Sequence, residues 1–351
     1  MKKLLGPLLA AAGAAGALRA MARRARQLDL RDRGVLITGA SRGLGLQLAR
    51  EFGRHGARLA ICARDPDELK RASDDLTARG VSVVTAPCDV GNREQVDAMV
   101  AAVTRELGAI DVLVNNAGVI QVGPVATMTV DDFEAAMASN FWGAIYATLA
   151  ALPAMRAIGR GRIVNIASIG GKVSVPHLLP YSASKFALVG FSEGLRAELA
   201  STGVLVTTVC PGLMRTGSPR NALFKGRHRA EYAWFAISDS LPGISMDVES
   251  AARRTVAACR AGEPEVILSL PAQVMARAHG LAPGLMAEAF ALAARVLPRA
   301  GGIGTRAARG WESESAAAPS LLTRLGDEAA RRNNQFPGPR HPSASRSPAG
   351  G

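Results

Sequence analysis

An apolar, β-rich run passes directly into a glycine-rich turn in Val35-Leu36-Ile37-Thr38-Gly39-Ala40-Ser41-Arg42-Gly43-Leu44-Gly45. Leu44, Leu48 and Phe52 then recur at helical spacing, so the stretch predicts a strand, a turn and a helix in succession. Glycines at such a turn let the backbone approach a pyrophosphate, whose charge meets the helix N-terminus. The spacing is G-x-x-x-G-x-G rather than the general G-x-G-x-x-G, and an ordinary strand-to-helix turn would also explain the glycines.

A second group of residues is Tyr181-Ser182-Ala183-Ser184-Lys185, with Ser168 thirteen residues before it. A phenol has an ordinary pKa of ~10, too high for ready proton exchange near neutrality. An ammonium at i+4 lies on the same helical face and favours the phenolate. A hydroxyl at a neighbouring strand end could then hold a carbonyl oxygen against the phenol, which would act as general acid or base. The alternative is a tyrosine packed at a helix start beside a solvated lysine.

Together these residues resemble the short-chain dehydrogenase/reductase family over about residues 34 to 270. The resemblance rests on separated motifs in the family's order. They are Thr38-Gly39-x-x-x-Gly43-x-Gly45, Asp89 after an apolar strand, Asn115-Asn116-Ala117-Gly118, Asn140 on a helix, Ser168…Tyr181-x-x-x-Lys185, and Pro211-Gly212 with Thr216.

The fold that the resemblance implies is α/β, with a doubly wound, Rossmann-like parallel sheet, helices on both faces and a C-terminal helical extension. Strands and helices alternate along the chain as βαβ units require. The expected elements are strands at 35–38, 58–63, 81–86, 110–114, 162–167, 204–210 and 265–270, and helices at 44–54, 67–79, 92–107, 131–155, 181–201, 285–296 and 321–332. We expect three regions: a basic and apolar leader (1–33), the catalytic domain (34–270), and an extension (271–351) whose Pro/Ser/Gly/Arg-rich end from residue 335 is disordered.

The resemblance implies hydride transfer between a nicotinamide cofactor and a carbonyl compound or alcohol. Ser168 would hydrogen-bond the substrate oxygen and Tyr181 would transfer the proton. Lys185 would lower the pKa of Tyr181 and bind the nicotinamide ribose, and Asn140 would hold a water that links Lys185 to solvent. Thr38 and Asn115 are expected to brace the sheet. The expected cofactor contacts are Gly39, Ser41, Arg42, Gly43, Leu44, Gly45, Arg64, Asp89, Val90, Asn116, Ala117, Gly118, Tyr181, Lys185, Pro211, Gly212 and Thr216.

The end of the second expected strand bears on the choice of cofactor. An acidic residue there would bind the ribose 2′-hydroxyl of NAD(H) and repel the 2′-phosphate of NADP(H). Arg64 stands at that point, and Arg42 in the glycine-rich turn can reach the same corner. Two guanidinium groups suit a phosphate, so NADP(H) is expected in preference to NAD(H), although Asp65 follows directly. The alternative is that both arginines are solvated surface residues.

Composition excludes several other classes of protein. The net charge of +13 is concentrated at the ends: residues 1–33 carry 8 basic and 2 acidic groups and residues 271–351 carry 10 and 5, which leaves 24 and 22 for the core. No nucleic-acid-binding motif accompanies these tails, so we expect no nucleic-acid partner. The cysteines form no C-x-x-C or Cys/His cluster, so we expect no metal site and a reducing compartment; they are Cys62, Cys88, Cys210 and Cys259.

The N-terminus has an apolar stretch, Leu4–Leu18, between Lys2-Lys3 and several arginines. It is short of the ~20 residues needed to span a bilayer. Arginines crowd the place where a signal cleavage site should lie. An interfacial helix at the inner face of a membrane and a loosely packed leader are both consistent with this pattern, and the location is expected to be cytoplasmic.

The segment between Leu213 and Asp247 is too long for a simple connection and is expected to be a lid. Its apolar residues, with others between Ser168 and Tyr181, predict a bulky apolar ketone, aldehyde or secondary alcohol as substrate. The alternative is a lid that packs against the C-terminal helices or a second subunit, in a homo-oligomer. A catalytically weak cofactor-binding or membrane-associated interaction protein is the alternative function. The residues behind the substrate prediction are Val173, Val175, His177, Leu178, Leu223, Phe224, Tyr232, Trp234, Phe235, Leu241, Ile244 and Met246.

Overall fold

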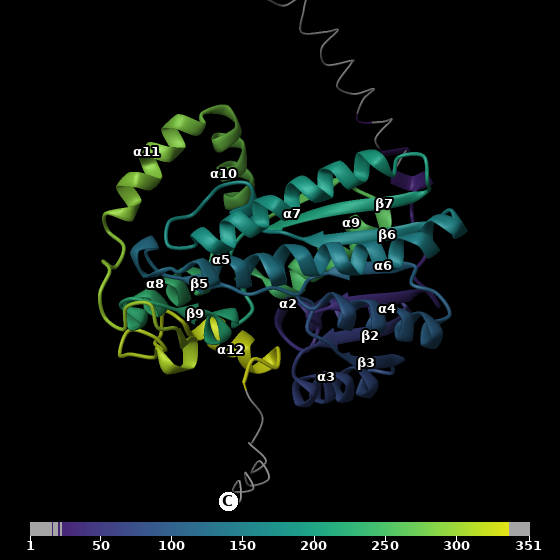
Figure 1. The fold of residues 1–351 in the computed structure, drawn as a ribbon, viewed down its shortest axis with the longest axis horizontal. Coiled ribbons are helices and arrows are strands. Elements are labelled where there is room, and N and C mark those ends of the chain that lie inside the picture. Colours follow the sequence, from purple (N-terminus) through teal and green to yellow (C-terminus); the bar gives the residue numbers. More distant parts are fainter. Residues whose placement is uncertain (1–15, 17–19, 22, 337–351) are drawn as a thin grey trace, which may run out of the picture.

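The computed structural model describes residues 16, 20–21 and 23–336. Its centre is a seven-stranded parallel sheet in the order β11-β7-β6-β4-β1-β2-β3 (Figure 1). The expected doubly wound, Rossmann-like sheet is thus confirmed. Its strands are β1 (Gly34–Thr38), β2 (Arg58–Ala63), β3 (Val83–Pro87), β4 (Val112–Asn115), β6 (Gly161–Ile166), β7 (Val204–Pro211) and β11 (Glu265–Leu268).

Apolar residues on both faces of each central strand bury the sheet between two layers of helices. Val35 and Ile37 of β1 belong to one core cluster, and Leu36 between them belongs to the other. The first cluster packs under α2 (Gly43–Arg54), α3 (Pro66–Ala78) and α9 (Val248–Ala261). The second packs under α4 (Arg93–Leu107) and α6 (Gly143–Ile158), with Leu195 and Leu199 from the end of α7 (Leu179–Glu198). This alternation fixes which way each strand faces.

The long helix expected at 131–155 is interrupted in the structure. It consists of α5 (Val130–Met137), a π-helical turn η2 (Ala138–Trp142), and α6. A π-helical turn widens the backbone locally and is common at functional sites. Asn140 lies in this turn, so the interruption decides the direction of its side chain.

By length and composition, one helical segment among the described residues, Val130–Ile158, could cross a membrane. Its residues Ala147, Ala151, Leu152 and Met155 are buried in the core cluster under α4 and α6. We therefore interpret the segment as a core helix of the α/β sandwich.

The lid and the C-terminal extension form a layer of their own. β5 (Gln121–Val122), β9 (Leu223–Phe224) and β12 (Ala308–Arg309) make a three-stranded sheet in the order β12-β9-β5. α8 (His228–Ser240) packs beside β9 and against α12 (Arg324–Arg332). β8 (Met214–Arg215) pairs with β10 (Met246–Asp247). The extension therefore covers the lid.

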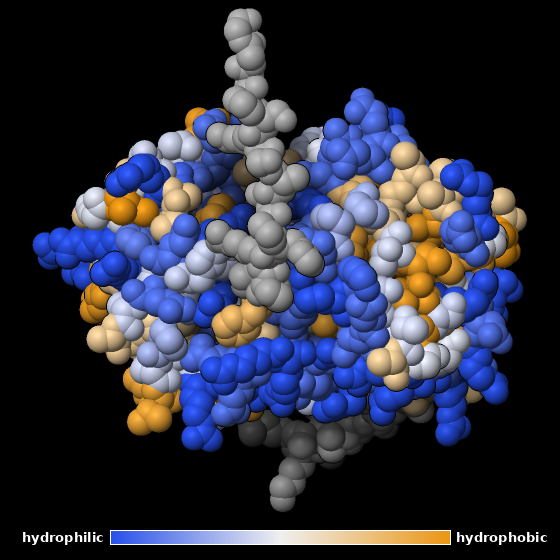
Figure 2. All heavy atoms as spheres, turned by 90° about the horizontal axis from the view of Figure 1, so that it is seen from below, coloured by the Kyte–Doolittle hydropathy of each residue, from blue (hydrophilic) through white to orange (hydrophobic). Residues whose placement is uncertain are grey.

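Two helices follow the main sheet and stand away from it: α10 (Leu270–Leu281) and α11 (Pro283–Ala294), seen at the upper left of Figure 1. α11 has no buried residue. The face beneath the molecule, around α3 and α12, is covered mainly by hydrophilic side chains (Figure 2). Apolar surface is thus unevenly distributed over the molecule.

At both ends, the described residues include parts of the segments expected to be loose. Leu30 is 1% exposed in the first core cluster, and the Leu28 N–H donates to the Arg260 carbonyl, 2.9 Å away. Gln335, expected in the disordered end, is 4% exposed and hydrogen-bonded, so that expectation is wrong at this residue. The remaining residues, 337–351, and the apolar stretch at 4–18 apart from Gly16 lie outside the described residues.

Candidate active site

The expected site residues follow the carboxyl ends of four neighbouring strands. Gly39 follows β1, Asn116 follows β4, Ser168 comes shortly after β6, and Gly212 follows β7. Because parallel strands end at one edge of the sheet, the topology gathers these residues there. The structure thus brings the separated motifs to one place.

Ser168 and Tyr181 are brought together by a short turn after β6. The Ser168 side chain caps the 3-10 turn Ile169–Gly171, and its Oγ accepts from the Gly170 N–H at 3.0 Å. A Cβ at Gly170 would lie 3.2 Å from Cε1 of Tyr181 and 3.4 Å from Oγ of Ser168. Glycine therefore leaves room for the phenol beside the serine. Burial raises the pKa of Tyr181, and its hydrogen bond with Ser168 lowers it in part.

Lys185 lies one helical turn after Tyr181, but its amine does not bond the phenol. Its Nζ donates to the Ile166 carbonyl at 2.8 Å and lies 5.7 Å from the centroid of the Tyr181 ring. Burial lowers the pKa of Lys185 to about 8. Loss of hydration outweighs the neighbouring thiol Cys210, which acts in the other direction. The expected effect of Lys185 on the tyrosine stays a prediction.

Asn140 links the π-helical turn to α7. Its Oδ1 accepts from the Val119 N–H at 2.8 Å, and its Nδ2 donates to Oγ of Ser184 at 2.8 Å. Ser184 in turn donates to the Tyr181 carbonyl at 2.7 Å. Sequence reasoning missed Ser184 as a connecting residue, although it lies within the Tyr181–Lys185 motif that signals the site.

The strand ends are braced as expected. Oγ1 of Thr38 accepts from the N–H groups of Asn116 and Ala117, at 3.0 and 3.1 Å. Nδ2 of Asn115 donates to Oγ1 of Thr148 at 3.0 Å and to Oδ1 of Asn165 at 2.8 Å. The structural roles expected for Thr38 and Asn115 are confirmed.

The glycine-rich turn has the backbone shape that its sequence predicts. Gly39 and Gly43 have φ of 63° and 58°, a region that favours glycine. A Cβ at Gly45 would lie 2.2 Å from the Gly39 carbonyl oxygen, so the helix can approach the turn this closely only without a side chain. Nδ2 of Asn116 donates to the Thr38 and Gly39 carbonyls at 3.0 and 2.9 Å and fixes the turn from below. The first turn of α2 therefore presents its N–H groups at this edge.

The corner where Arg42 and Arg64 are expected to bind a phosphate contains a carboxylate that sequence reasoning missed. Glu68, in the first turn of α3, pairs with Arg42 and accepts from Oγ of Ser41 at 2.9 Å. Arg64 is exposed, and Asp65 caps α3 by accepting from its first N–H groups. Asp65 is therefore occupied as a helix cap, and Glu68 is the acidic residue that bears on this corner.

The other expected cofactor contacts lie around the same edge. Oδ1 of Asp89 accepts from the Gly91 N–H at 3.0 Å, and Val90 is buried against the glycine at the start of α6. A Cβ at Gly118 would lie 2.7 Å from Oδ1 of Asn140. Glycine at position 118 thus leaves room for the side chain of Asn140.

The loop after β7 is held by several hydrogen bonds. The Gly212 N–H, next to Pro211, donates to the Leu268 carbonyl at 3.2 Å, and Oγ1 of Thr216 accepts from the Ser218 N–H at 3.0 Å. The Met214 N–H donates to the buried Asp239 carboxylate of α8 at 3.1 Å. The loop is thereby joined to the lid.

Three aromatic residues of the lid form a core of their own. Phe224 is fully buried, and it makes edge contacts with Tyr232 and Phe235 at centroid distances of 5.4 and 6.0 Å. They therefore do not all face the reacting carbon, and the contact of α8 with α12 matches the alternative that the lid packs against the C-terminal helices. Trp234 and Val175, which are partly buried at the margin of this cluster, can still face a substrate.

A buried polar contact holds the lid to the segment before Tyr181. Glu231 is fully buried, and its carboxylate lies 2.9 Å from Nδ1 of His177. Nε1 of Trp234 donates to the same carboxylate at 2.7 Å. His177 was expected among the residues that line the substrate, and it instead bonds to the lid.

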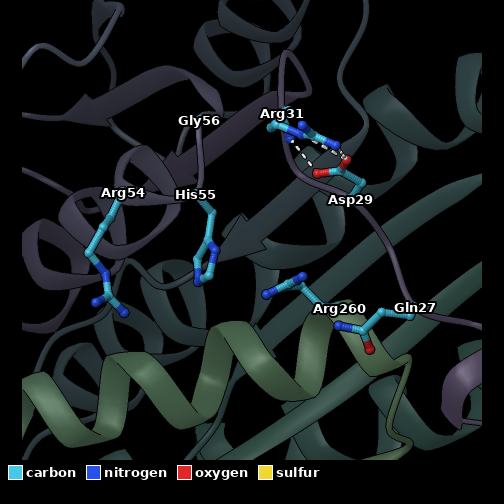
Figure 3. Close-up of a pocket in the computed structure, with 7 residues that line it drawn as sticks. All are labelled: Gln27, Asp29, Arg31, Arg54, His55, Gly56 and Arg260. Atoms are coloured by element: carbon cyan, nitrogen blue, oxygen red, sulfur yellow. Dashed lines mark hydrogen bonds and ion pairs between the residues drawn. The ribbon is translucent and has the colours of Figure 1, made fainter.

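The hollow shown in Figure 3 is remote from this chemistry. It is bordered by Gly56, just before β2, and by Arg260 at the end of α9, so it lies at the opposite edge of the sheet. None of the expected site residues lines it. Among the described residues, no group of three or more His, Cys, Asp or Glu could hold a metal ion.

Comparison with known proteins agrees with this geometry. The model of the short chain dehydrogenase family matches residues 33–223. The chain belongs to that family. It is 43% identical over 184 residues to a putative ketoacyl reductase of Streptomyces coelicolor, covering 52% of this chain and 70% of the relative.

Other relatives and structures carry related names. A dehydrogenase/reductase SDR family member 7B of Danio rerio is 37% identical over 228 residues, covering 62% of this chain and 73% of the relative. Among solved structures, an actinorhodin polyketide ketoreductase variant with NADPH is 36% identical, with a TM-score of 0.61, covering 68% of this chain and 95% of that chain. The site residues thus lie on the scaffold of a short-chain oxidoreductase that these proteins share.

Proposed function

We propose that the chain transfers hydride reversibly between NADP(H) and a bulky apolar ketone, aldehyde or secondary alcohol. The observation that carries this proposal is the group formed by Ser168, Tyr181, Lys185 and Asn140 at the edge that presents the glycine-rich turn. A catalytically weak protein on the same fold would have no need to keep all four residues at this edge.

The bound nicotinamide supplies or accepts the hydride. In the direction of reduction, Ser168 donates a hydrogen bond to the carbonyl oxygen and Tyr181 transfers its proton to that oxygen. Lys185, as an ammonium held by the Ile166 carbonyl, stabilises the phenolate that remains. The backbone that places these groups is fixed before substrate binds, so catalysis rests on positioning and electrostatics.

The residues present fit a dinucleotide. The positive φ of Gly39, the close approach at Gly45 and the start of a helix directly after the turn are what a diphosphate needs. Arg42 and Arg64 would bind the 2′-phosphate that distinguishes NADP(H), once Arg42 leaves Glu68. The ketoreductase with NADPH, and an oxidoreductase in complex with NADP that is 30% identical with a TM-score of 0.57, support this choice of cofactor.

Support for an apolar substrate comes from the margin of the lid. Val175, Leu178 and Trp234 border the segment that leads to Tyr181. Relatives named as ketoacyl reductases support a keto group on a carbon chain as the reacting group.

The test is a series of 2-ketones of increasing chain length with NADPH and with NADH. Each buried methylene should add up to ~0.8 kcal/mol of binding, so kcat/KM should rise by up to about fourfold per carbon and then level off. Preference for NADH, or a flat profile with short polar ketones favoured, would contradict the cofactor or the substrate assignment respectively.

We also propose contact with the cytoplasmic face of an anionic membrane through α10 and α11. Leu281, Leu285 and Leu292 are 88%, 73% and 64% exposed. From residue 270 to residue 300 the exposed charges are Arg277, Arg295 and Arg299 against the single acid Glu288. Apolar side chains flanked by cations suit lipid head groups, and the basic leader at 1–33 would add to the attraction.

A further inference from the structure

The last described residues of the chain lie across the edge of the sheet where the cofactor is proposed to bind. α12 ends at Arg332, and the chain continues as Asn333-Asn334-Gln335-Phe336. Figure 1 shows α12 between the lid elements α8 and β9 and the helix α3. Asn333 is fully buried and Gln335 is 4% exposed, so these polar residues are packed within the protein.

One side of this segment is bonded to the glycine-rich turn. The Gly43 N–H donates to the Asn333 carbonyl at 2.9 Å. Nδ2 of Asn334 donates to the Ser41 carbonyl at 2.8 Å, and its Oδ1 accepts from Nε of Arg71 at 2.9 Å. The C-terminal segment therefore hydrogen-bonds one carbonyl group, of Ser41, and one N–H group, of Gly43, in the turn that would bind a dinucleotide.

The glycine at position 43 has a second reason to lack a side chain. A Cβ there would lie 2.7 Å from Nε2 of Gln335. The amide of Gln335 thus lies directly against the turn, at the N-terminus of α2. An uncharged donor in this position is compatible with a diphosphate nearby.

The other side of the segment is bonded to the loop that follows Pro211-Gly212 and Thr216. Nδ2 of Asn221 donates to Oε1 of Gln335 at 2.6 Å and to its carbonyl at 3.1 Å. The guanidinium of Arg220 lies 4.1 Å from the ring centroid of Phe336. A Cβ at Gly217 would lie 2.3 Å from Cβ of Ala330, so α12 also packs directly on this loop.

We propose that Asn333–Phe336 is a strap that closes over bound NADP(H), joining the glycine-rich turn to the lid loop and slowing release of the cofactor. The proposal rests on the proposed function, because it needs NADP(H) at this edge. A dinucleotide that reaches from the glycine-rich turn to Pro211-Gly212 would lie between the two structures that the strap connects. The strap must open for each exchange of cofactor, so its hydrogen bonds oppose release.

The test uses the full chain and measures the rate of NADPH dissociation by stopped-flow fluorescence, together with Kd. Asn334→Ala removes three side-chain hydrogen bonds, to Ser41 in the turn and to Glu68 and Arg71 of α3. Asn221→Ala removes the two from the lid loop. Each variant should therefore release NADPH about tenfold faster or more, with a smaller change in association rate. Arg324→Ala, at an exposed ion pair on α12, is the matched control and should release NADPH at the wild-type rate.

Hydrogen exchange gives a second measurement that does not depend on the variants. Amides of residues 330–336 should gain protection when NADPH binds to the wild-type protein. Release at the wild-type rate from both variants, or no added protection, would overturn the strap. Tighter binding by the variants would overturn it too, because it would show a segment that blocks the site. If the wild-type protein binds no NADPH at all, the proposed function itself fails.

Discussion

At the scale of single residues, burial acts differently on two titratable groups of α7, Tyr181 and Lys185. It raises the pKa of Tyr181, which keeps the phenol protonated, and it lowers the pKa of Lys185 to about 8. Both shifts follow from the loss of hydration of the charged form. The phenol is therefore ready to donate a proton, and the ammonium that would stabilise the resulting phenolate is present below about pH 8.

Tyr181→Phe should lose most of its turnover and keep its cofactor affinity. Removal of a general acid typically costs ~10²–10⁴-fold in rate, and the phenyl ring preserves the packing. Tyr146→Phe, which changes a tyrosine stacked on Trp142, is the control and should keep normal turnover. The measurements are kcat on the best ketone and Kd for NADPH. Near-normal kcat for Tyr181→Phe would remove this residue as the proton donor.

The pH dependence of reduction should report Lys185. Its folded-state pKa lies below the ordinary value, so the ammonium is present below about pH 8 and is lost as the pH rises through that value. We therefore expect kcat/KM to fall above pH 8, because kcat/KM follows ionisation in the free enzyme. A profile measured from pH 6 to pH 10 that stays flat to the alkaline end would contradict this role.

Glu68 should set the strength of the NADP(H) preference. Replacing Arg42 and Arg64 with Met should weaken NADPH binding about 100-fold or more and change NADH binding little, since each charge-assisted contact contributes about 1.5–3 kcal/mol. Glu68→Gln should instead tighten NADPH binding, because Arg42 is then no longer held by a carboxylate. Titration by fluorescence gives both Kd values. Equal losses for the two cofactors in the double variant would refute the assignment of these arginines.

At the scale of elements, the lid is held at several places, and two of them involve a buried acid, Glu231 or Asp239. Asp239 of α8 is 4% exposed and accepts from the Met214 N–H of the loop after β7. Burial raises its pKa to about 7, although this hydrogen bond and Arg215 act in the other direction. One of the groups that hold the lid is therefore a carboxylate that is costly to ionise.

Asp239→Asn should stabilise the protein at pH 8 and have little effect near pH 4. The folded-state pKa lies above the ordinary value, so the folded state binds more protons between about pH 4 and pH 7, and stability is lost as the pH rises through that interval. The amide keeps the acceptor and removes the charge. The gain in free energy of unfolding at pH 8 is at most about 4 kcal/mol. Thermal unfolding at both pH values checks it.

The control for this experiment is Asp247→Asn. Asp247 caps α9 by accepting from the Ser250 N–H at 3.0 Å, and its pKa is lowered. Neutralising it should therefore destabilise the protein at pH 8. A fall in melting temperature for Asp239→Asn at pH 8 equal to that of the control would contradict a costly buried charge.

The sequence predicted the elements that local patterns determine. The strands that precede Gly39 and Ser168 and the helix that carries Tyr181 are confirmed within a few residues, because short apolar runs between turns and helical periodicity are both local patterns. The π-helical turn at Asn140 was not predicted, since it arises from packing against Val119 and α7. Nor were the contacts of Asn333–Gln335 with the glycine-rich turn, because no local pattern reveals a partner almost three hundred residues away.

At the scale of the whole molecule, the pair α10–α11 departs from a polar surface, because several of its leucines are exposed. The helix expected at 285–296 is present as α11, and the absence of buried residues in it excludes a role in covering the core. The two candidates for what covers the apolar side chains of α10 and α11 are a lipid surface and a second copy of the chain, and the flanking arginines favour lipid.

Liposome flotation distinguishes these occupants. The full chain should float with anionic vesicles at low salt, and the double variant Leu285→Asp, Leu292→Asp should not. Asp substitutions add negative charge and polar groups where apolar contact is needed. Val130→Asp, at another exposed apolar site, is the control and should float. A full chain that stays unbound but changes from dimer to monomer with the double variant would assign the surface to a second copy.

The bond between Gln47 and Asn333 joins residues 286 positions apart in the chain. During synthesis, the glycine-rich turn emerges almost three hundred residues before its partners. The N-terminal part of the nascent chain can begin its sheet but must wait for residue 333 before this contact forms. Contacts of such long separation slow folding, so the final docking of α12 is expected to be the late step in maturation. A chain cut before residue 333 would leave the glycine-rich turn and the helix after it without these contacts.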